Sequence, residues 1–278
     1  MLFHRKFTVR ILFGIPVALV FLIISGLYYC YIAGYIEQVD TTGFRVFVYL
    51  LFHLDLFLTS WSYCMCFLTD PGSVPEFFNL DTLNNQELIE ECVESDIVFA
   101  KSSFCNKCQK IRPARAHHCS VCDKCILRMD HHCPWIGNCV GFYNHRYFVQ
   151  FLLYAGIGLF IVSMSCASLL WEHYGDGHIS TLFGGIVGFS LALSVFGMGI
   201  FHLWMIVNNR CSIEIRYLGH YNVFDTGSRM QNFQQIFGQV WYKYFLPIPI
   251  KPKCGGINYP VRIRTKQGSV ILFEEFSG

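Results

Sequence analysis

A cluster of cysteine and histidine residues occupies the middle of this 278-residue sequence. Seven cysteines and four histidines lie within residues 105–139, and they include Cys-x2-Cys pairs followed by further His and Cys residues. This spacing is typical of structural zinc sites, which take four ligands at tetrahedral corners. Because the segment has few aliphatic residues, it cannot fold by hydrophobic burial alone, and we expect bound metal to stabilise it.

Two sites of three cysteines and one histidine would use six of the seven thiols. The candidate ligands are Cys105, Cys108, His118, Cys119, Cys122, Cys125, His132 and Cys139, with His117 as an alternative to His118. Spacing alone does not sort these ligands between two ions. Closed sites predict structural metals, whereas a hydrolytic zinc would need an open position and a nearby glutamate, and residues 105–146 contain no Glu.

Two such sites leave one of the seven cysteines without a metal. We interpret it as Cys133, which directly follows Asp130, His131 and His132. A free thiol has a pKa of about 8.5, so at neutral pH it needs a base or a positive field to react. We interpret Cys133 as a nucleophile, His131 as its base and Asp130 as the acid that orients the imidazole. The alternative is that Cys133 is itself a ligand of a different metal site.

The rest of the sequence is unusually apolar. Only 14% of the residues are charged and 53% are hydrophobic, whereas soluble domains carry about 25% charged residues. Four stretches are long enough to span a bilayer, at about 11–33, 44–68, 149–171 and 180–207. We read the first as a retained helix rather than a signal peptide, because its apolar run is too long and no small-residue cleavage site follows it.

These stretches predict an all-α polytopic membrane protein with four transmembrane helices. An N-terminal hairpin would occupy residues 1–68, a linker and the double-zinc domain 69–148, a second hairpin 149–207, and a tail 208–278.

Loops 34–43 and 172–179 contain no Lys or Arg, whereas basic residues are frequent near the N-terminus, within 101–146 and after 208. The positive-inside rule therefore predicts that the cysteine-rich segment and both termini face the cytosol. The alternative, a disulfide-rich lumenal loop, needs inverted topology, and the reducing cytosol favours metal-binding or catalytic cysteines.

The cysteine-rich segment resembles the DHHC family of protein S-acyltransferases (palmitoyltransferases). The resemblance runs from Cys105 to about Phe148, and its marks include Pro113, Arg115, Cys133-Pro134-Trp135, Asn138-Cys139 and Asn144. It extends more weakly to Asp70-Pro71-Gly72, Glu214 and Asn232. It implies interleaved zinc sites, one of Cys105, Cys108, His118 and Cys125 and the other of Cys119, Cys122, His132 and Cys139.

The resemblance also implies the reaction. The enzyme would take a long-chain acyl group, palmitoyl, from acyl-CoA onto Cys133 and pass it to cysteines of membrane-associated proteins at the cytosolic membrane face. Asp130, His131 and Cys133 would be catalytic and His132 a ligand. We expect an endomembrane protein of the Golgi or endoplasmic reticulum, with the plasma membrane as the alternative, and no nucleic-acid partner.

Other residues receive supporting interpretations. Trp135 could line the point where the acyl chain enters, or be an interface-belt aromatic. Gly158 could leave room at the end of the acyl cavity, with close helix packing as the alternative. Glu214 and Asn232 would support the catalytic domain, but where the family usually has Thr-Thr-x-Glu this chain has Cys211-Ser212-Ile213-Glu214. Residues 233–242 predict a helix that lies either in the membrane interface or on the cytosolic domain.

Two other functions compete with acyl transfer. A zinc-stabilised membrane scaffold or ligase adaptor would need neither a spare thiol nor a base beside it. A transporter would be expected to have more polar or broken membrane helices, and Asp55 is the one clear acidic residue at membrane depth.

Overall fold

The computed structural model describes residues 2–32, 42–75, 103–172, 179–217, 222–250, 255–266 and 270–273. The chain divides into two compact units. The first consists of Met1–Phe67, Pro134–Gly137 and Tyr147–His202, and the second of Leu68–Cys133, Asn138–Arg146 and Leu203–Gly278. The predicted linker over 76–99 lies outside the described residues.

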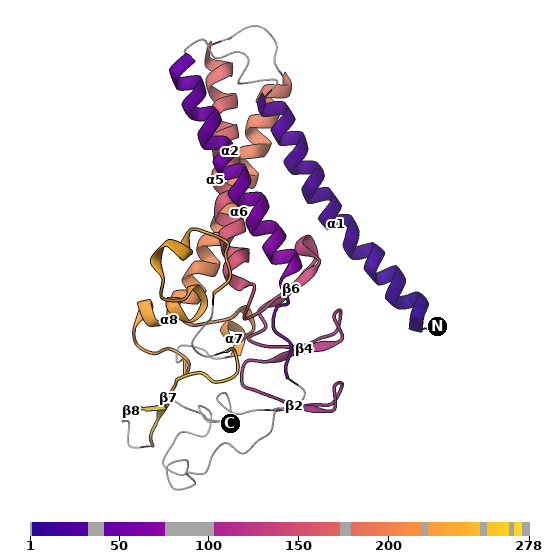
Figure 1. Ribbon diagram of the computed structural model, residues 1–278, viewed down its shortest axis with the longest axis vertical. Helices are drawn as coiled ribbons and strands as arrows, with labels where there is room; N and C mark the ends of the chain where they lie inside the picture. The colour runs from indigo at the N-terminus through magenta and orange to yellow at the C-terminus, as the bar shows by residue number, and fades with distance from the viewer. Residues whose placement is uncertain are drawn as a thin grey trace. The chain divides into compact units, whose positions relative to one another are not determined.

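Four long helices form most of the first unit (Figure 1). They are α1 (Leu2–Tyr31), α2 (Thr42–Leu68), α5 (His145–Glu172) and α6 (Ile179–Val207). Among the described residues, three stretches are long and apolar enough to cross a membrane: Val46–Leu68, His145–Ala167 and Gly184–Val207. The corresponding stretch of α1, Gly14–Tyr29, is apolar but shorter. Three of the four predicted spans are therefore present as candidate membrane helices.

Aromatic rings join the helices of this unit. Tyr31 of α1 lies against Phe52 of α2, with ring centroids 4.1 Å apart, and Phe21 meets Tyr63 edge to face at 5.3 Å. Tyr31, Val48 and Phe52 share a buried cluster with Val162 of α5. Because these rings bury large areas and have preferred mutual orientations, they fix how the helices meet.

Glycines let the helices approach closely. A Cβ at Gly156 of α5 would lie 2.7 Å from the Cβ of Phe196 in α6, and one at Gly199 of α6 would lie 3.0 Å from Leu153. At Gly158 the space is taken by the carboxylate of Asp55 from α2. Small residues at helix contacts are the usual means of close packing in membranes. The packing alternative for Gly158 thus agrees with its surroundings.

The cysteine-rich part of the second unit consists of three antiparallel hairpins (Figure 1). They pair β1 (Ser103–Cys105) with β2 (Lys110–Arg112), β3 (His117–Cys119) with β4 (Lys124–Ile126), and β5 (His131–Cys133) with β6 (Asn138–Val140). The expectation of an all-α chain was wrong for this segment, although the chain as a whole is mostly helical. Strands of three residues are too short to produce a periodic pattern in the sequence.

The tail continues the second unit with α7 (Ser212–Tyr217), α8 (Arg229–Phe237), the 3-10 helix η3 (Trp241–Tyr244) and a hairpin of β7 (Val261–Arg264) with β8 (Val270–Phe273). The Ser228 hydroxyl caps α8 by accepting a hydrogen bond from Gln231 N, and the helix ends at Gly238, whose φ of 76° favours glycine. One face of α8 is buried in this unit through Asn232, Gln235, Ile236 and Phe237.

Prediction for helix packing. Gly156→Leu should lower the thermal unfolding midpoint of the purified protein in detergent, because the added side chain overlaps Phe196. Overpacking of this kind costs about 1–3 kcal/mol. Gly197→Leu, on α6, is the matched control because a Cβ there meets nothing within 4 Å. Equal midpoints for the two variants would contradict the described contact between α5 and α6.

Candidate metal and catalytic site

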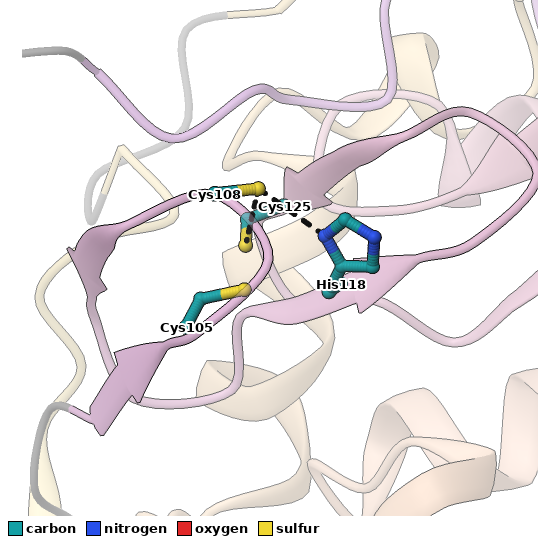
Figure 2. A group of neighbouring side chains, drawn as sticks. All are labelled: Cys105, Cys108, His118 and Cys125. Carbon is teal, nitrogen blue, oxygen red and sulfur yellow. Dashed lines mark hydrogen bonds between the residues drawn. The ribbon is translucent and has the colours of Figure 1, made fainter. Parts of the chain in front are cut away.

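The first candidate metal group takes its ligands from two hairpins. Cys105 and Cys108 come from the β1–β2 hairpin, and His118 and Cys125 are paired residues of the β3–β4 hairpin. Their side chains converge on one point (Figure 2), and all four ligand atoms lie within 4.8 Å of one another. Cys108 Sγ is 3.2 Å from His118 Nδ1 and 3.7 Å from Cys125 Sγ.

The second group uses the next pair of hairpins. Cys119 and Cys122 come from the β3–β4 hairpin, and His132 and Cys139 are paired residues of the β5–β6 hairpin. The His132 Nδ1 atom is 3.7, 3.4 and 3.5 Å from the sulfur atoms of Cys119, Cys122 and Cys139 respectively. Cys122 Sγ and Cys139 Sγ are 3.5 Å apart.

Both groups have dimensions that suit a tetrahedral ion. Zinc, with bonds of about 2.3 Å to sulfur and about 2.0–2.1 Å to nitrogen, holds two sulfurs about 3.8 Å apart and a sulfur and a nitrogen about 3.5 Å apart. The distances within the two groups are close to these values. All six cysteines are free thiols rather than disulfides. Each group could therefore hold one metal ion, and three Cys with one His is a structural zinc set.

The membership of the groups is the interleaved one that the resemblance implied. His118, and not its neighbour His117, supplies the imidazole of the first group. The spacing in the sequence could not distinguish His117 from His118 as the ligand, because adjacent residues lie in the same region of the chain. In the folded hairpin they point to opposite faces of a strand, so only one can turn toward the ion.

The same alternation separates the histidines of β5. Because side chains on a strand point alternately to its two faces, His131 and Cys133 share one face while His132 turns to the other, toward the second metal group. Cys133 is buried, at 6% exposure, and belongs to neither of the two described metal groups. A thiol and an imidazole are thus brought together beside a metal site without being part of it.

His131 is held by partners on both sides. Its Nδ1 atom donates to Asp130 Oδ2 at 2.7 Å, and its ring also hydrogen-bonds with Cys133. Burial alone would lower the pKa of His131, but the hydrogen bonds with Asp130 and Cys133 outweigh it and raise the pKa to about 9. The charged form of the His131 imidazole is therefore favoured once the ring has accepted a proton.

Comparison with known proteins gives the family. A sequence model described as DHHC palmitoyltransferase matches residues 98–217. An Arabidopsis thaliana protein named "Probable protein S-acyltransferase 13" is 34% identical over 243 residues, which make up 78% of this chain and 79% of that protein. The palmitoyltransferases ZDHHC2 and ZDHHC20 of Homo sapiens are 32% and 31% identical, covering 90% and 91% of this chain and 76% and 78% of theirs.

The chain belongs to the DHHC palmitoyltransferase family. The resemblance expected from the cysteine-rich segment and the enzyme class that it implied are confirmed, and a scaffold without acyl transfer is not favoured. Two histidine- and cysteine-rich groups that could hold metal ions, and three candidate membrane helices among the described residues, accompany the cysteine-rich segment.

Ser212 is a site residue whose contact the sequence did not reveal. At the start of α7, its backbone N–H donates to Asp130 Oδ1 at 2.8 Å and its hydroxyl donates to Asp130 Oδ2 at 2.7 Å. Asp130 is 2% exposed, so these donors take the place of water. The sequence did show that Cys211-Ser212-Ile213-Glu214 retains one of the hydroxyls of the family pattern. Only the fold shows that this hydroxyl reaches the carboxylate of Asp130.

Glu214, the predicted support residue, pairs with Arg115. The Arg115 guanidinium donates from Nε to Oε1 at 2.6 Å and from Nη2 to Oε2 at 2.8 Å, a bidentate arrangement. Burial alone would lower the pKa of Arg115, but the Glu214 carboxylate holds it above its usual range. The ring of Phe224 lies 4.3 Å from the same guanidinium. This pair ties α7, and hence Ser212, to the DHHC segment.

Cys211 and Asn232 complete the support. Cys211 lies buried beside Arg115 Nη2, at 3.6 Å, and burial raises the pKa of its thiol to about 12, so it is a neutral packing residue. Asn232 is 1% exposed and donates to Val207 O at 3.0 Å and to Asp225 Oδ1 at 2.7 Å. It therefore fastens α8 to the end of α6.

Trp135 and Gly158 belong to the first unit, whereas the catalytic candidates belong to the second. The backbone carbonyl of Trp135 accepts a hydrogen bond from the Tyr63 hydroxyl at 2.8 Å, and 52% of the residue is exposed. Its exposed indole is compatible with either interpretation made from the sequence.

Prediction for the two histidines. His132→Ala should lower the zinc content by about one ion per chain, because it removes a ligand from a closed site. His131→Ala should retain both ions and lose about 10²–10⁴-fold in the rate of self-acylation, the usual value of a general base. Zinc analysis beside single-turnover kinetics distinguishes the variants. Reversed phenotypes would overturn the division of roles.

Prediction for Ser212. Ser212→Ala removes one of the two donors to Asp130 and should slow self-acylation while both metals stay bound. A hydrogen bond to a charged group is worth about 1.5–3 kcal/mol, so the expected loss is about tenfold or more. Ser212→Thr keeps the hydroxyl and is the matched control, expected to stay near the wild-type rate. If alanine and threonine at this position gave the same rate, the hydroxyl would have no role in orienting Asp130.

Proposed function

We propose that this chain is a protein S-acyltransferase that accepts a palmitoyl group from acyl-CoA on Cys133 and transfers it to cysteines of membrane-associated proteins. The observation that carries the proposal is the arrangement on β5. Cys133 shares a face with His131, whose ring is anchored to Asp130, while His132 serves the second metal group. Membership of the DHHC family supports the same reaction.

In the first half-reaction Cys133 attacks the acyl thioester. The imidazole of His131, through the nitrogen not bonded to Asp130, takes the Cys133 thiol proton and becomes the charged ring that its raised pKa favours. The Cys133 sulfur then forms a bond to the carbonyl carbon. The bond between that carbon and the coenzyme A sulfur breaks, and the departing thiolate receives the proton from His131. The products are an acyl-Cys133 thioester and free coenzyme A.

In the second half-reaction the roles repeat with a different thiol. A cysteine of the substrate protein gives its proton to His131 and attacks the acyl-Cys133 carbonyl. The bond to Cys133 breaks, and the Cys133 thiolate recovers the proton. Throughout, Asp130 holds the imidazole in one tautomer and stabilises its charged form, and Ser212 holds Asp130.

The metals have a structural role in this proposal. Each group supplies four protein ligands, which leaves no open position for a substrate or an attacking water. Two bound Zn²⁺ ions would fix the three hairpins, and the second ion would also fix the backbone beside Cys133 through His132.

We further propose that the chain spans the membrane four times, with α1 as the fourth span and with both termini and the active site in the cytosol. The distribution of Lys and Arg supports this orientation. Since α5 begins at His145, shortly after Cys133, the nucleophile would lie at the cytosolic membrane face. An endomembrane, Golgi or endoplasmic reticulum, is the proposed compartment.

The acyl chain would then extend into the bilayer part of the protein. We keep Trp135 and Gly158 as the residues proposed to contact it. The Asp55 carboxylate occupies the space beside Gly158. The end of the acyl-chain cavity at this level would therefore be formed by Asp55 and Gly158 together, rather than by a glycine with empty space beside it.

Prediction for the nucleophile. Cys133→Ser should abolish formation of a hydroxylamine-labile acyl group when the purified protein is incubated with radiolabelled palmitoyl-CoA, because the thioester can no longer form. Cys64→Ser, which alters a free cysteine of α2, is the control and should leave labelling unchanged. Persistent hydroxylamine-labile label in the Cys133 variant would assign the nucleophile to another residue.

A further inference from the structure

The segment that follows α8 exposes large apolar side chains next to one another. Val240 is 40% exposed, Trp241 70%, Tyr242 47% and Phe245 62%. We call residues 240–246 the aromatic loop. Single exposed apolar residues are common on protein surfaces, but adjacent large ones usually mark a contact with another phase or another molecule.

The aromatic loop packs against α8. The ring of Phe233 in α8 stacks on Phe237, with centroids 4.3 Å apart, and meets Tyr244 of the loop edge to face at 5.0 Å. Ile236 and Phe237 are buried, and the ring of Phe237 meets Tyr244 at 6.3 Å. The turn at Gly238 directs the chain from the helix into the loop. The exposed side chains are therefore held outward by their neighbours.

The backbone of the aromatic loop is hydrogen-bonded within the protein. Lys243 N donates to Val240 O at 3.0 Å, and Phe245 N donates to Tyr242 O at 3.3 Å. The carbonyls of Lys243 and Leu246 both accept from Arg146 Nη2, at 3.3 and 2.7 Å. Backbone groups that are paired in this way can enter a medium poor in water at little cost.

Arg146, which bonds the aromatic loop, lies at the start of a candidate membrane span. It is 1% exposed and is the second residue of α5, whose candidate membrane span runs from His145 to Ala167. The loop is thus bonded to the chain at the residue where a span begins.

We propose that the aromatic loop inserts into the headgroup region of the bilayer leaflet at which α5 begins, and so docks the catalytic domain on the lipid surface. Trp and Tyr are the residues enriched at this depth, because their rings are apolar and their N–H and O–H groups remain hydrated. Lys243, partly exposed within the loop, adds attraction to anionic headgroups. The proposal concerns the tail alone and does not depend on the reaction of Cys133.

The test is fluorescence quenching of the full chain in lipid nanodiscs. The emission of wild type minus that of Trp241→Phe isolates the contribution of Trp241. Brominated lipids with bromine near the top of the acyl chain should reduce this difference emission by about twofold or more, and aqueous iodide should have little effect. If Trp241→Phe does not fold, Tyr242→Trp provides a second indole in the loop. Its contribution is the emission of this variant minus the emission of wild type.

Phe104→Trp is the matched control. Phe104 is also an exposed aromatic, at 54%, but lies on β1 in the cysteine-rich segment. Its added emission should respond to iodide and not to brominated lipid. Quenching of the loop indoles by iodide alone would overturn the proposal. So would protection from both quenchers, which would place a second copy of the chain or another protein on the loop.

Discussion

The middle hairpin of the cysteine-rich segment contributes side chains to both candidate metal groups, and the position of the catalytic candidates depends on it. His118 and Cys125 of the β3–β4 hairpin face the first metal group, while Cys119 and Cys122 face the second. Removing one ion would release a neighbouring hairpin and also loosen the hairpin shared with the other ion. Because strands of three residues bury little apolar area, metal coordination would be the interaction that holds them in register.

Catalytic order then spreads outward from β5 by hydrogen bonds. His132 fixes the strand to the second metal group, which leaves His131 and Cys133 on the other face. Asp130 orients His131 and is itself held by Ser212. The buried Arg115–Glu214 pair keeps α7 in place, since breaking it would leave an uncompensated charge away from water. Ser212, far along the sequence, is thereby linked to the His131 imidazole through Asp130.

The sequence predicted the features that depend on long apolar stretches or on closely spaced Cys and His residues. The four helices follow from apolar stretches, and the pool of candidate ligands follows from the Cys-x2-Cys spacing, whereas the division of that pool into two groups of four came from the family resemblance. The hairpins were missed because their strands are shorter than any periodic signal. The contact of Ser212 with Asp130 and the closeness of Asp55 to Gly158 were missed because both arise from chain segments far apart in sequence. Residues 233–242 were predicted to form a helix in the membrane interface or on the cytosolic domain, but only the fold separates a buried face on α8 from the exposed aromatic loop.

The central claim is that seven clustered thiols divide into six metal ligands and one nucleophile, Cys133. X-ray absorption at the zinc edge, before and after the enzyme is loaded with an acyl group from palmitoyl-CoA, tests it most directly. The account predicts two zinc ions per chain with an average shell of three sulfurs and one nitrogen, unchanged when Cys133 carries the acyl group. A loss of sulfur from the zinc shell, or a loss of zinc, on acylation would show that the acylated thiol was a ligand and would contradict the account.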